Sequence, residues 1–254
     1  MTPCRLIIDP PQDGAWNMAV DEALLDDAAD GGMASLRFYQ WREPTLSLGY
    51  FQSHTERQSH EASLGLVVVR RLSGGGALLH DRELTYSLCL PAAHPQAHDS
   101  KNLYEVVHRS LISVLSAFDV APVLQGVGAS AAEPAAEPFL CFARRTAADV
   151  ILPSADGTAS SKIVGSAQRR RRGAVLQHGA LLLSGSQFAP ELTGISEFTR
   201  ETISPEVLVV PWQEAIAAAL RLQLRRHDVD ADLRQNAQRL QVGKYALRSW
   251  TERR

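Results

Sequence analysis

Residues 66–80 read LVVVRRLSGGGALLH, an apolar run followed by two arginines, a serine and three consecutive glycines. The run of valines predicts a strand over residues 65–71 that is buried on both faces. Three glycines remove every Cβ, so the main chain can approach a ligand closely and present N–H groups to a carbonyl or phosphate oxygen. A flexible hairpin turn is the alternative. The flanking Arg71 and His80 favour a ligand-binding loop.

Helical and strand patterns alternate on both sides of this loop. Apolar residues of the stretch 16–25 recur with the spacing of one helix face, and Asp13 is its predicted N-cap. Strands are predicted at 37–41 and 45–50, a hairpin is predicted from 77–80 and 85–90, and a helix is predicted over 103–118. The residues from 126 to 138 form an expected exposed connection.

The second half of the chain continues this alternation. Strands are predicted at 141–142, 147–152, 162–165 and 174–183, with a turn at 153–157. Residues 212–226 and 229–250 are predicted to be mainly helical. We therefore expect an α/β fold with a mixed sheet, organised as one catalytic domain over 1–254. Its helices from about residue 205 are expected to pack on the sheet, without an accessory domain.

Composition excludes several classes of function. The 254 residues carry 26 Lys and Arg against 28 Asp and Glu, a net charge of −2, so we expect no nucleic-acid partner. No 18 consecutive residues are apolar, so no membrane span is predicted. The cysteines, Cys4, Cys89 and Cys141, are odd in number and have no CxxC spacing, which argues against disulfides and zinc. Free thiols suggest a reducing, cytoplasmic location.

Two side chains are candidates for covalent chemistry. The Cys141 thiol, once ionised, can hold an acyl group as a thioester, whereas burial as a small apolar residue is the alternative. An ammonium close to a thiol favours its charged form, and Lys162 is one of three lysines against 23 arginines. A solvated charge at a strand end is the other interpretation of Lys162. Neither Cys4 nor Cys89 has a visible activating group.

Two further groups stand apart from the loop. The run Arg169-Arg170-Arg171-Arg172 is expected to form a hydrated turn because adjacent cations repel. Docking of an acidic protein partner is its alternative role. His178 is either a base or a hydrogen-bonded strand residue, and we favour the latter.

The ordered motifs resemble those of the lipoate-protein ligase and octanoyltransferase family. They are NMAxDEALL at 17–25, RRxSGGGA at 70–77 followed by His80, ELTYS at 83–87, KxxGSAQ at 162–168 and QHG at 177–179. The resemblance covers roughly residues 5 to 250. It implies a mixed α/β fold related to biotin-protein ligases and the attachment of lipoyl or octanoyl chains to a lysine of lipoyl domains.

Within that family, the chain looks like the Cys-dependent octanoyltransferases of the Gram-positive type. The resemblance implies that Cys141 and Lys162 are catalytic. It also assigns substrate binding to the residues Arg71, Ser73, Gly74, Gly75, Gly76, His80, Gly165, Ser166 and Ala167. Octanoate would pass from acyl carrier protein through a Cys141 thioester to a lipoyl-domain lysine. The acyl chain is expected in an apolar tunnel near the glycine loop.

Other activities of the family remain open from the sequence. A ligase would activate free lipoate with ATP and Mg²⁺, and an amidotransferase would move octanoyl groups between lipoyl domains. Ligases typically lack this cysteine, so we expect the transferase, with no cofactor. Its expected partners are octanoyl-acyl carrier protein and lipoyl-domain proteins such as glycine-cleavage H protein or a 2-oxoacid dehydrogenase E2. The protein is expected to be a monomer.

Overall fold

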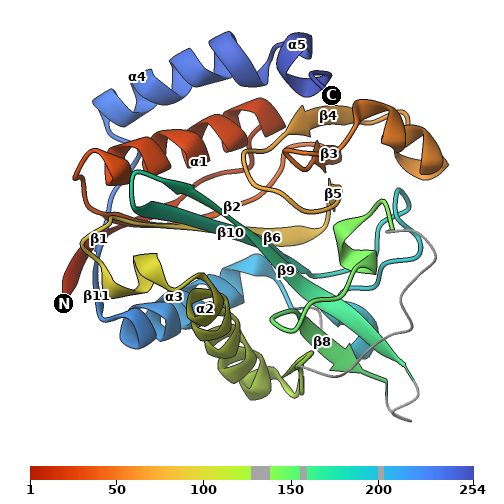
Figure 1. The fold of residues 1–254 in the computed structure, drawn as a ribbon. Helices are drawn as coiled ribbons and strands as arrows, with labels where there is room; N and C mark the ends of the chain where they lie inside the picture. The colour runs from red at the N-terminus through yellow and green to blue at the C-terminus, as the bar shows by residue number, and fades with distance from the viewer. Residues whose placement is uncertain (127–137, 155–158, 200–202) are drawn as a thin grey trace.

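A mixed sheet runs through the computed structural model, which describes residues 1–126, 138–154, 159–199 and 203–254 (Figure 1). Within these residues the sheet has eight strands in the order β11-β1-β2-β6-β10-β9-β8-β7. β1 pairs in parallel with both β11 and β2, and the remaining neighbours are antiparallel. The strands are β1 (Thr2–Ile8), β2 (Ala34–Tyr39), β6 (Glu83–Leu90), β7 (Val123–Leu124), β8 (Val150–Pro153), β9 (Ser160–Arg171), β10 (Ala174–Leu182) and β11 (Leu222–Arg226).

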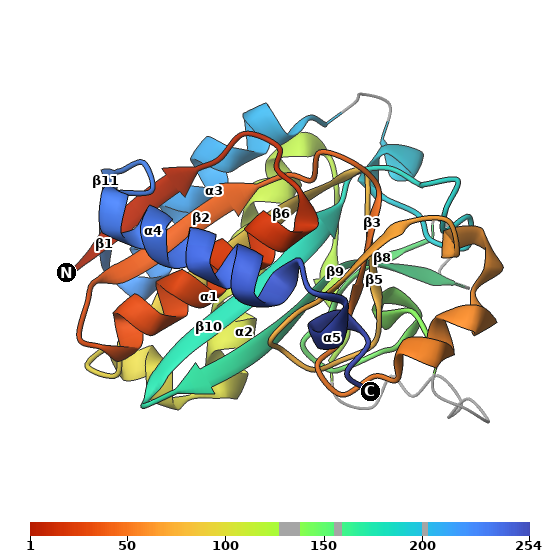
Figure 2. The ribbon, with the colours of Figure 1, turned by 90° about the horizontal axis from the view of Figure 1, so that it is seen from above.

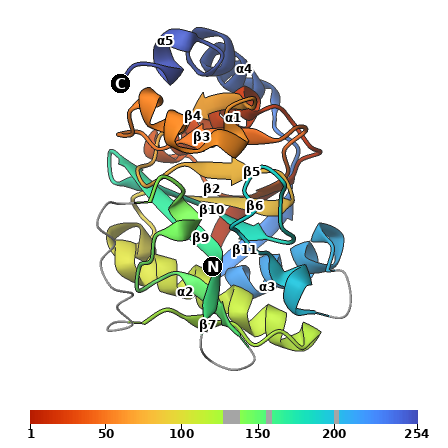
Figure 3. The same cartoon turned by 90° about the vertical axis from the view of Figure 1, so that its right-hand side faces the viewer.

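Helices cover both faces of this sheet (Figure 3). α1 (Gly14–Ala29) and α4 (Ala231–Leu240) lie on one face, and α2 (Ser100–Leu115) and α3 (Pro205–Leu220) lie on the other. Each face has its own apolar core, one around Trp212 and the other around α1. The predicted α/β class and mixed sheet are confirmed. None of the helices in the described ranges combines the length and apolar character needed to cross a bilayer.

A small second sheet lies beside the large one and carries the glycine loop (Figure 2). Its strands are β4 (Val67–Arg70), β3 (Thr45–Leu48) and β5 (Leu78–His80), in that order. The predicted burial of the valine run on both faces is wrong, because β4 is an edge strand and Val67 is 46% exposed. The predicted hairpin of β5 with β6 is also wrong. β5 pairs with β3 and β6 pairs with β2 and β10, so the short connection between them joins two sheets.

The N-terminal helix forms as its sequence pattern predicts. The Asp13 carboxylate accepts a hydrogen bond from the Trp16 N–H at 2.8 Å, which satisfies one of the free donors of the first turn of α1. The predicted helix at 103–118 corresponds to α2 and a short 3₁₀ turn, η4 (Ser116–Phe118). The connection at 126–138 and the turn at 153–157 fall mostly outside the described residues.

The C-terminal region contains a strand where helix was predicted. α3 ends at Arg221, which adopts a left-handed conformation with φ 53° and redirects the chain. Leu222 and Leu224 then alternate with more exposed residues, as in a half-buried strand, and β11 pairs with β1. The region after α4 continues through a π turn, η7 (Gln241–Tyr245), to the short helix α5 (Arg248–Thr251). Elements after residue 205 therefore pack on both faces and at one edge of the sheet.

Replacement of Trp212 by alanine tests this packing. The indole is fully buried and contacts the rings of Phe38 and Tyr86 at centroid distances of 5.4 and 5.0 Å. Loss of so large a buried side chain should lower the free energy of unfolding by about 3–5 kcal/mol in a denaturant titration. Val210 lies on the same helix and is 51% exposed, so Val210→Ala should change it by only about 0.5 kcal/mol. Equal effects of the two changes would contradict the burial of this face.

Candidate active site

The glycine loop encloses the guanidinium of Arg71, which is buried. Its Nη2 donates to the carbonyls of Gly74 and Gly76 at 2.8 and 2.6 Å, and its Nη1 donates to the carbonyl of Ser47 at 2.8 Å. Gly75 adopts φ 90°, a conformation that favours glycine, and this allows the loop to close around the cation. Within the described part of the chain, Arg71 forms no ion pair with a carboxylate, and its Nε has no hydrogen-bond partner. The loop therefore holds a buried positive charge that neutral groups alone surround.

A hydrogen-bonded chain fixes the start of this loop. The Ser73 hydroxyl lies 2.5 Å from Nε2 of His178, and Nδ1 of His178 lies 3.0 Å from the Asp21 carboxylate. Burial opposes ionisation of Asp21, but the hydrogen bond from His178 and the charge of Arg37 outweigh it, so the pKa of Asp21 is lowered. An ionised carboxylate only accepts, so Nδ1 of His178 donates to Asp21. His178 is a residue of strand β10 that is hydrogen-bonded at both ring nitrogens.

Cys141 faces the loop from a short turn. Its N–H donates to the Ala77 carbonyl at 2.7 Å, and the Ala77 N–H donates to Phe139, which joins this segment to the end of the glycine loop. Sγ lies 3.9 Å from the position that a Cβ on Gly75 would occupy, and the residue is half-buried. The predicted strand at 141–142 is wrong, since Cys141 opens the 3₁₀ turn η5 (Cys141–Ala143). The turn places the thiol at the glycine loop instead of in the sheet.

Lys162 lies beside this turn, on β9. Its ammonium forms an ion pair with Asp149 at 2.9 Å and donates to the carbonyls of Cys141 and Arg144 at 3.1 and 3.3 Å. These three acceptors match the three donors of an ammonium group. Lys162 therefore reaches the main chain of Cys141. It holds the turn that carries the thiol, and Asp149 balances its charge.

The charge that interacts with the thiol comes from the loop. The pKa of Arg71 is lowered to about 10, mainly by burial. The charge of Arg144 also lowers this pKa, whereas a negative charge on Cys141 would raise it. Arg71 remains charged at neutral pH. The loop thus places a buried positive charge beside the sulfur of Cys141. Across the site, burial and then the charge of Cys141 raise the pKa of Tyr104 to about 12, so this phenol stays neutral.

The other predicted binding residues occupy two places. Ala167 and His80 line a narrow cavity of about 20 Å³ together with Arg71 and His178. Nδ1 of His80 bonds to Glu83, its ring stacks on Trp41, and its Nε2 has no partner among the described residues. The cavity has room for about one water molecule, so an acyl chain can enter only if side chains around it move.

Gly165 and Ser166 lie on the strand that carries Lys162. The Ser166 hydroxyl is 2.7 Å from both Tyr86 and His108, so its side chain belongs to a buried polar network. Gly165 passes directly beneath Lys162, and a Cβ there would stand 2.8 Å from its Cε. A side chain at this position would require the end of the Lys162 side chain to shift. A cavity of about 400 Å³ opens next to this network and reaches Asp149.

Sequence reasoning missed Asp149 and Arg144. Asp149 precedes the buried strand β8, and its position as the lone acid of residues 138–154 was the available signal. Arg144 crosses the loop, with its Nε 2.7 Å from the position of a Cβ on Gly76. Gly76 therefore leaves room for a second guanidinium near the thiol. Nothing local in the sequence indicated that Arg144 folds back onto the glycines.

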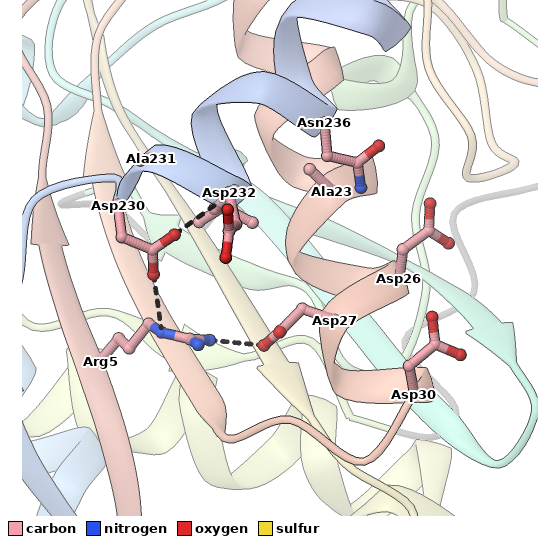
Figure 4. A pocket seen from close by; sticks show the side chains of 10 residues that line it. Arg5, Ala23, Asp26, Asp27, Asp30, Asp230, Ala231, Asp232 and Asn236 are labelled. Atoms are coloured by element: carbon pink, nitrogen blue, oxygen red, sulfur yellow. Dashed lines mark hydrogen bonds and ion pairs between the residues drawn. The ribbon is translucent and has the colours of Figure 1, made fainter.

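A third cavity, of about 540 Å³, lies between α1 and α4 and is acidic (Figure 4). Arg5 of β1 pairs there with Asp27 at 2.5 Å and with Asp230 at 4.0 Å. Its walls hold no nucleophile and none of the loop residues, so it is separate from the candidate active site. Further carboxylates line the cavity from Asp26, Asp30 and Asp232.

Comparison with known proteins places the chain in a family. The model of the lipoyl protein ligase A/B catalytic domain matches residues 13–206. The fold is similar to a bipartite lipoate protein ligase from Thermoplasma acidophilum, with a TM-score of 0.76 at 19% identity over 99% of this chain and 97% of that one. It is also similar to lipoate-protein ligase A solved with ATP, with a TM-score of 0.77 at 20% identity over 98% of each chain. The chain belongs to the lipoyl protein ligase A/B catalytic domain family.

Sequence relatives define the branch of the family. The chain is 30% identical to octanoyltransferase LipM of Geobacillus kaustophilus over 94% of both chains, and 31% identical to octanoyltransferase LipM of Kyrpidia tusciae over 98% of both. These relatives confirm the predicted enzyme class, octanoyltransferase.

Gly165→Ala tests whether Lys162 must lie over β9. The added Cβ would meet Lys162 Cε at 2.8 Å and Nζ at 3.2 Å, displacing the ammonium without removing any functional group. A displacement of about 1 Å at a catalytic centre costs on the order of 100-fold in rate, so we expect a loss of that size in kcat. Gly243→Ala, where nothing lies within 4 Å, is the matched control. Full activity of Gly165→Ala would exclude a positioning role for Lys162.

Arg71→Met tests the source of the thiol's reactivity. Loss of the buried cation should slow alkylation of Cys141 by iodoacetamide at pH 7 about tenfold, which corresponds to about 1.4 kcal/mol of lost interaction. Arg248→Met removes an 88% exposed arginine and should leave the rate unchanged, and thermal unfolding checks that each variant folds. An unchanged rate in Arg71→Met together with a slow rate in Lys162→Met would assign the activating charge to Lys162 instead.

Proposed function

We propose that this octanoyltransferase takes its acyl group from octanoyl-acyl carrier protein, holds it on Cys141 and delivers it to a lipoyl-domain lysine. The observation that carries the proposal is the half-buried Cys141 thiol facing a buried, carboxylate-free guanidinium across the glycine loop. We propose that Cys141 reacts as the thiolate, which is the nucleophile that exchanges thioesters.

The reaction consists of two acyl transfers. In the first, the Cys141 thiolate attacks the donor carbonyl, the new C–S bond forms, and the pantetheine sulfur leaves as a thiolate that takes a proton from solvent. In the second, the neutral amine of the acceptor lysine attacks the enzyme thioester. The amide forms, Cys141 leaves as thiolate again, and the amine loses its proton to solvent. Lys162 keeps the turn of Cys141 in place through its carbonyl during both steps.

Main-chain donors of the loop are suited to the oxyanion of each step. The carbonyl of Gly74 points at Arg71, and the trans peptide unit turns the N–H of Gly75 in the opposite direction. This N–H donates no hydrogen bond within the residues that the structure describes. A preorganised donor of this kind contributes on the order of 3 kcal/mol to stabilising the transition state.

The octanoyl chain is proposed to lie on the apolar cluster beside Cys141. Buried side chains of Leu78, Phe142, Ala180 and Leu182 form this cluster, and Cys141 packs against it. Each buried methylene contributes about 0.8 kcal/mol, so chain length should be selected here. Side chains must move apart to admit the chain.

The proposed route uses no nucleotide and no metal, since a donor thioester is already activated for transfer. We also propose that acceptors are lipoyl domains such as H protein or E2, and that the enzyme acts as a cytoplasmic monomer. The free state of all three cysteines is consistent with a reducing compartment.

Cys141→Ser tests the covalent route. Mixed with octanoyl-acyl carrier protein and a lipoyl domain, without ATP or magnesium, the unaltered enzyme should octanoylate the acceptor lysine, as intact mass shows. Cys141→Ser should lower the rate by at least about 1000-fold because the acyl-enzyme cannot form. Cys89→Ala, which alters a fully buried cysteine of β6, should retain the activity.

Other results would reassign the reaction. An undiminished rate in Cys141→Ser would contradict the thioester route. Dependence on ATP, with release of pyrophosphate, would identify a ligase. Transfer from an octanoylated lipoyl domain but not from carrier protein would identify an amidotransferase.

A further inference from the structure

A partly exposed group of arginines and aromatic rings lies next to the glycine loop and includes residues at the end of the chain. The group, here called the arginine–aromatic patch, consists of Tyr50, Phe51, Arg169, Trp250, Arg253 and Arg254. Arg253 lies over the rings of Tyr50 and Trp250 at 4.1 and 4.6 Å. Arg169 lies over Tyr50 at 5.0 Å and Arg254 over Phe51 at 5.3 Å. Ring faces thus hold three guanidinium groups in place.

These three arginines differ from their neighbours in having no acidic partner. Arg171 pairs with Glu22 and Asp26, and Arg172 pairs with Asp30 at 2.7 Å. Arg170 folds onto Ser100 at the opposite face of β9. Among the described residues, no carboxylate forms an ion pair with Arg169, Arg253 or Arg254. The predicted hydrated turn at 169–172 is therefore wrong for Arg169, Arg170 and Arg171, which lie on β9, and Arg169 joins the patch.

The patch is firmly attached beside the active site. Arg70, at the end of β4, donates to the Thr251 carbonyl at 2.7 Å, and the Trp250 indole donates to the Arg70 carbonyl at 2.9 Å. These bonds hold α5 against the strand that leads into the glycine loop (Figure 2). Phe51 lies 3.7 Å from the Cβ position of Gly74, and its side chain is 64% exposed. One surface therefore continues from the loop to the three arginines.

We propose that the arginine–aromatic patch is the docking surface for an acidic face of the donor carrier protein. This inference rests on the proposed function for the identity of the donor. The protein has a net charge of −2, yet three arginines without an acidic partner lie together beside the candidate active site. This local positive charge favours an anionic partner there. Arg169 and Arg253 lie over Tyr50, and Arg254 lies over Phe51, so the guanidinium groups are spread over two neighbouring rings. This spread suits several carboxylates of a protein surface better than a single phosphate group.

Acylation of Cys141 by three donors tests the proposal. The variant Arg169→Ala/Arg253→Ala/Arg254→Ala is compared with the unaltered enzyme, and intact mass gives the acylation rate without acceptor. With octanoyl-carrier protein, the variant should lose about 10- to 100-fold in the second-order rate constant. With octanoyl-phosphopantetheine and octanoyl-pantetheine, its rates should be unchanged. If the rate with octanoyl-phosphopantetheine falls as much as the rate with carrier protein, the patch binds the phosphate group and not an acidic protein face.

A control variant that loses the same number of arginines, and the transfer from acyl-enzyme to the lipoyl domain, test whether the effect is specific to the patch and to the donor. Arg109→Ala/Arg172→Ala/Arg239→Ala removes three exposed arginines from other elements and should leave acylation by carrier protein unchanged. Equal loss in this control would mean that only overall charge matters. Enzyme acylated beforehand with octanoyl-pantetheine should pass its acyl group to the lipoyl domain equally well with or without the patch. A slower transfer with normal acylation would assign the surface to the acceptor.

Binding separates this proposal from the proposed function. Carrier protein should bind Cys141→Ser with a Kd that rises with salt, and removal of the three arginines should weaken binding about 10-fold or more. If the unaltered enzyme binds carrier protein in this way but forms no acyl adduct, the proposed acyl transfer is wrong and the proposed docking surface is supported. Binding that is independent of the three arginines would overturn the docking surface.

Discussion

The site depends on one constraint: the Arg71 guanidinium is buried and must be surrounded without a carboxylate. Backbone carbonyls are the acceptors that remain, and three of them, from Ser47, Gly74 and Gly76, turn inward to it. Burial of a charge is costly unless hydrogen bonds compensate it, so the glycine loop has to curl around this side chain. The positive φ of Gly75 follows from that curl, as does the outward direction of its N–H. The sulfur of Cys141 faces this loop, 3.9 Å from the Cβ position of Gly75.

Two positive groups lie beside this thiol and the turn that carries it. Arg71 faces it from the loop, whereas Lys162, neutralised by Asp149, holds the turn from behind through the Cys141 carbonyl. Removal of either one should weaken acyl transfer, although for different reasons: the first through the charge state of the sulfur, the second through its position. Gly165 bears on the position of the sulfur, because it leaves the space that the Lys162 side chain occupies.

Sequence patterns predicted the local elements better than their pairing. The apolar spacing and Asp13 identified α1 correctly, since both signals lie within one helix. The pairing of β5 with β3 and of β11 with β1 depends on contacts between residues far apart in sequence, which no local pattern contains. Leu222 and Leu224 carried a strand signal, but the helical pattern before them masked it. For the candidate site, the family motifs contain Arg71 and Lys162, whereas Cys141 was predicted from the chemistry of a thiol and the likeness to the Cys-dependent branch. The contacts of Asp149 and Arg144 arise only once turn η5 packs on the loop.

The central claim is that Cys141, facing a buried cation, carries the acyl group. The most direct measurement is to mix the enzyme with octanoyl-acyl carrier protein alone, digest it and locate the added mass by peptide mass spectrometry. The account predicts one octanoyl group per chain, without nucleotide, on the peptide that contains Cys141. Octanoyl on the Cys4 or Cys89 peptide, or no adduct until ATP is added, would contradict it.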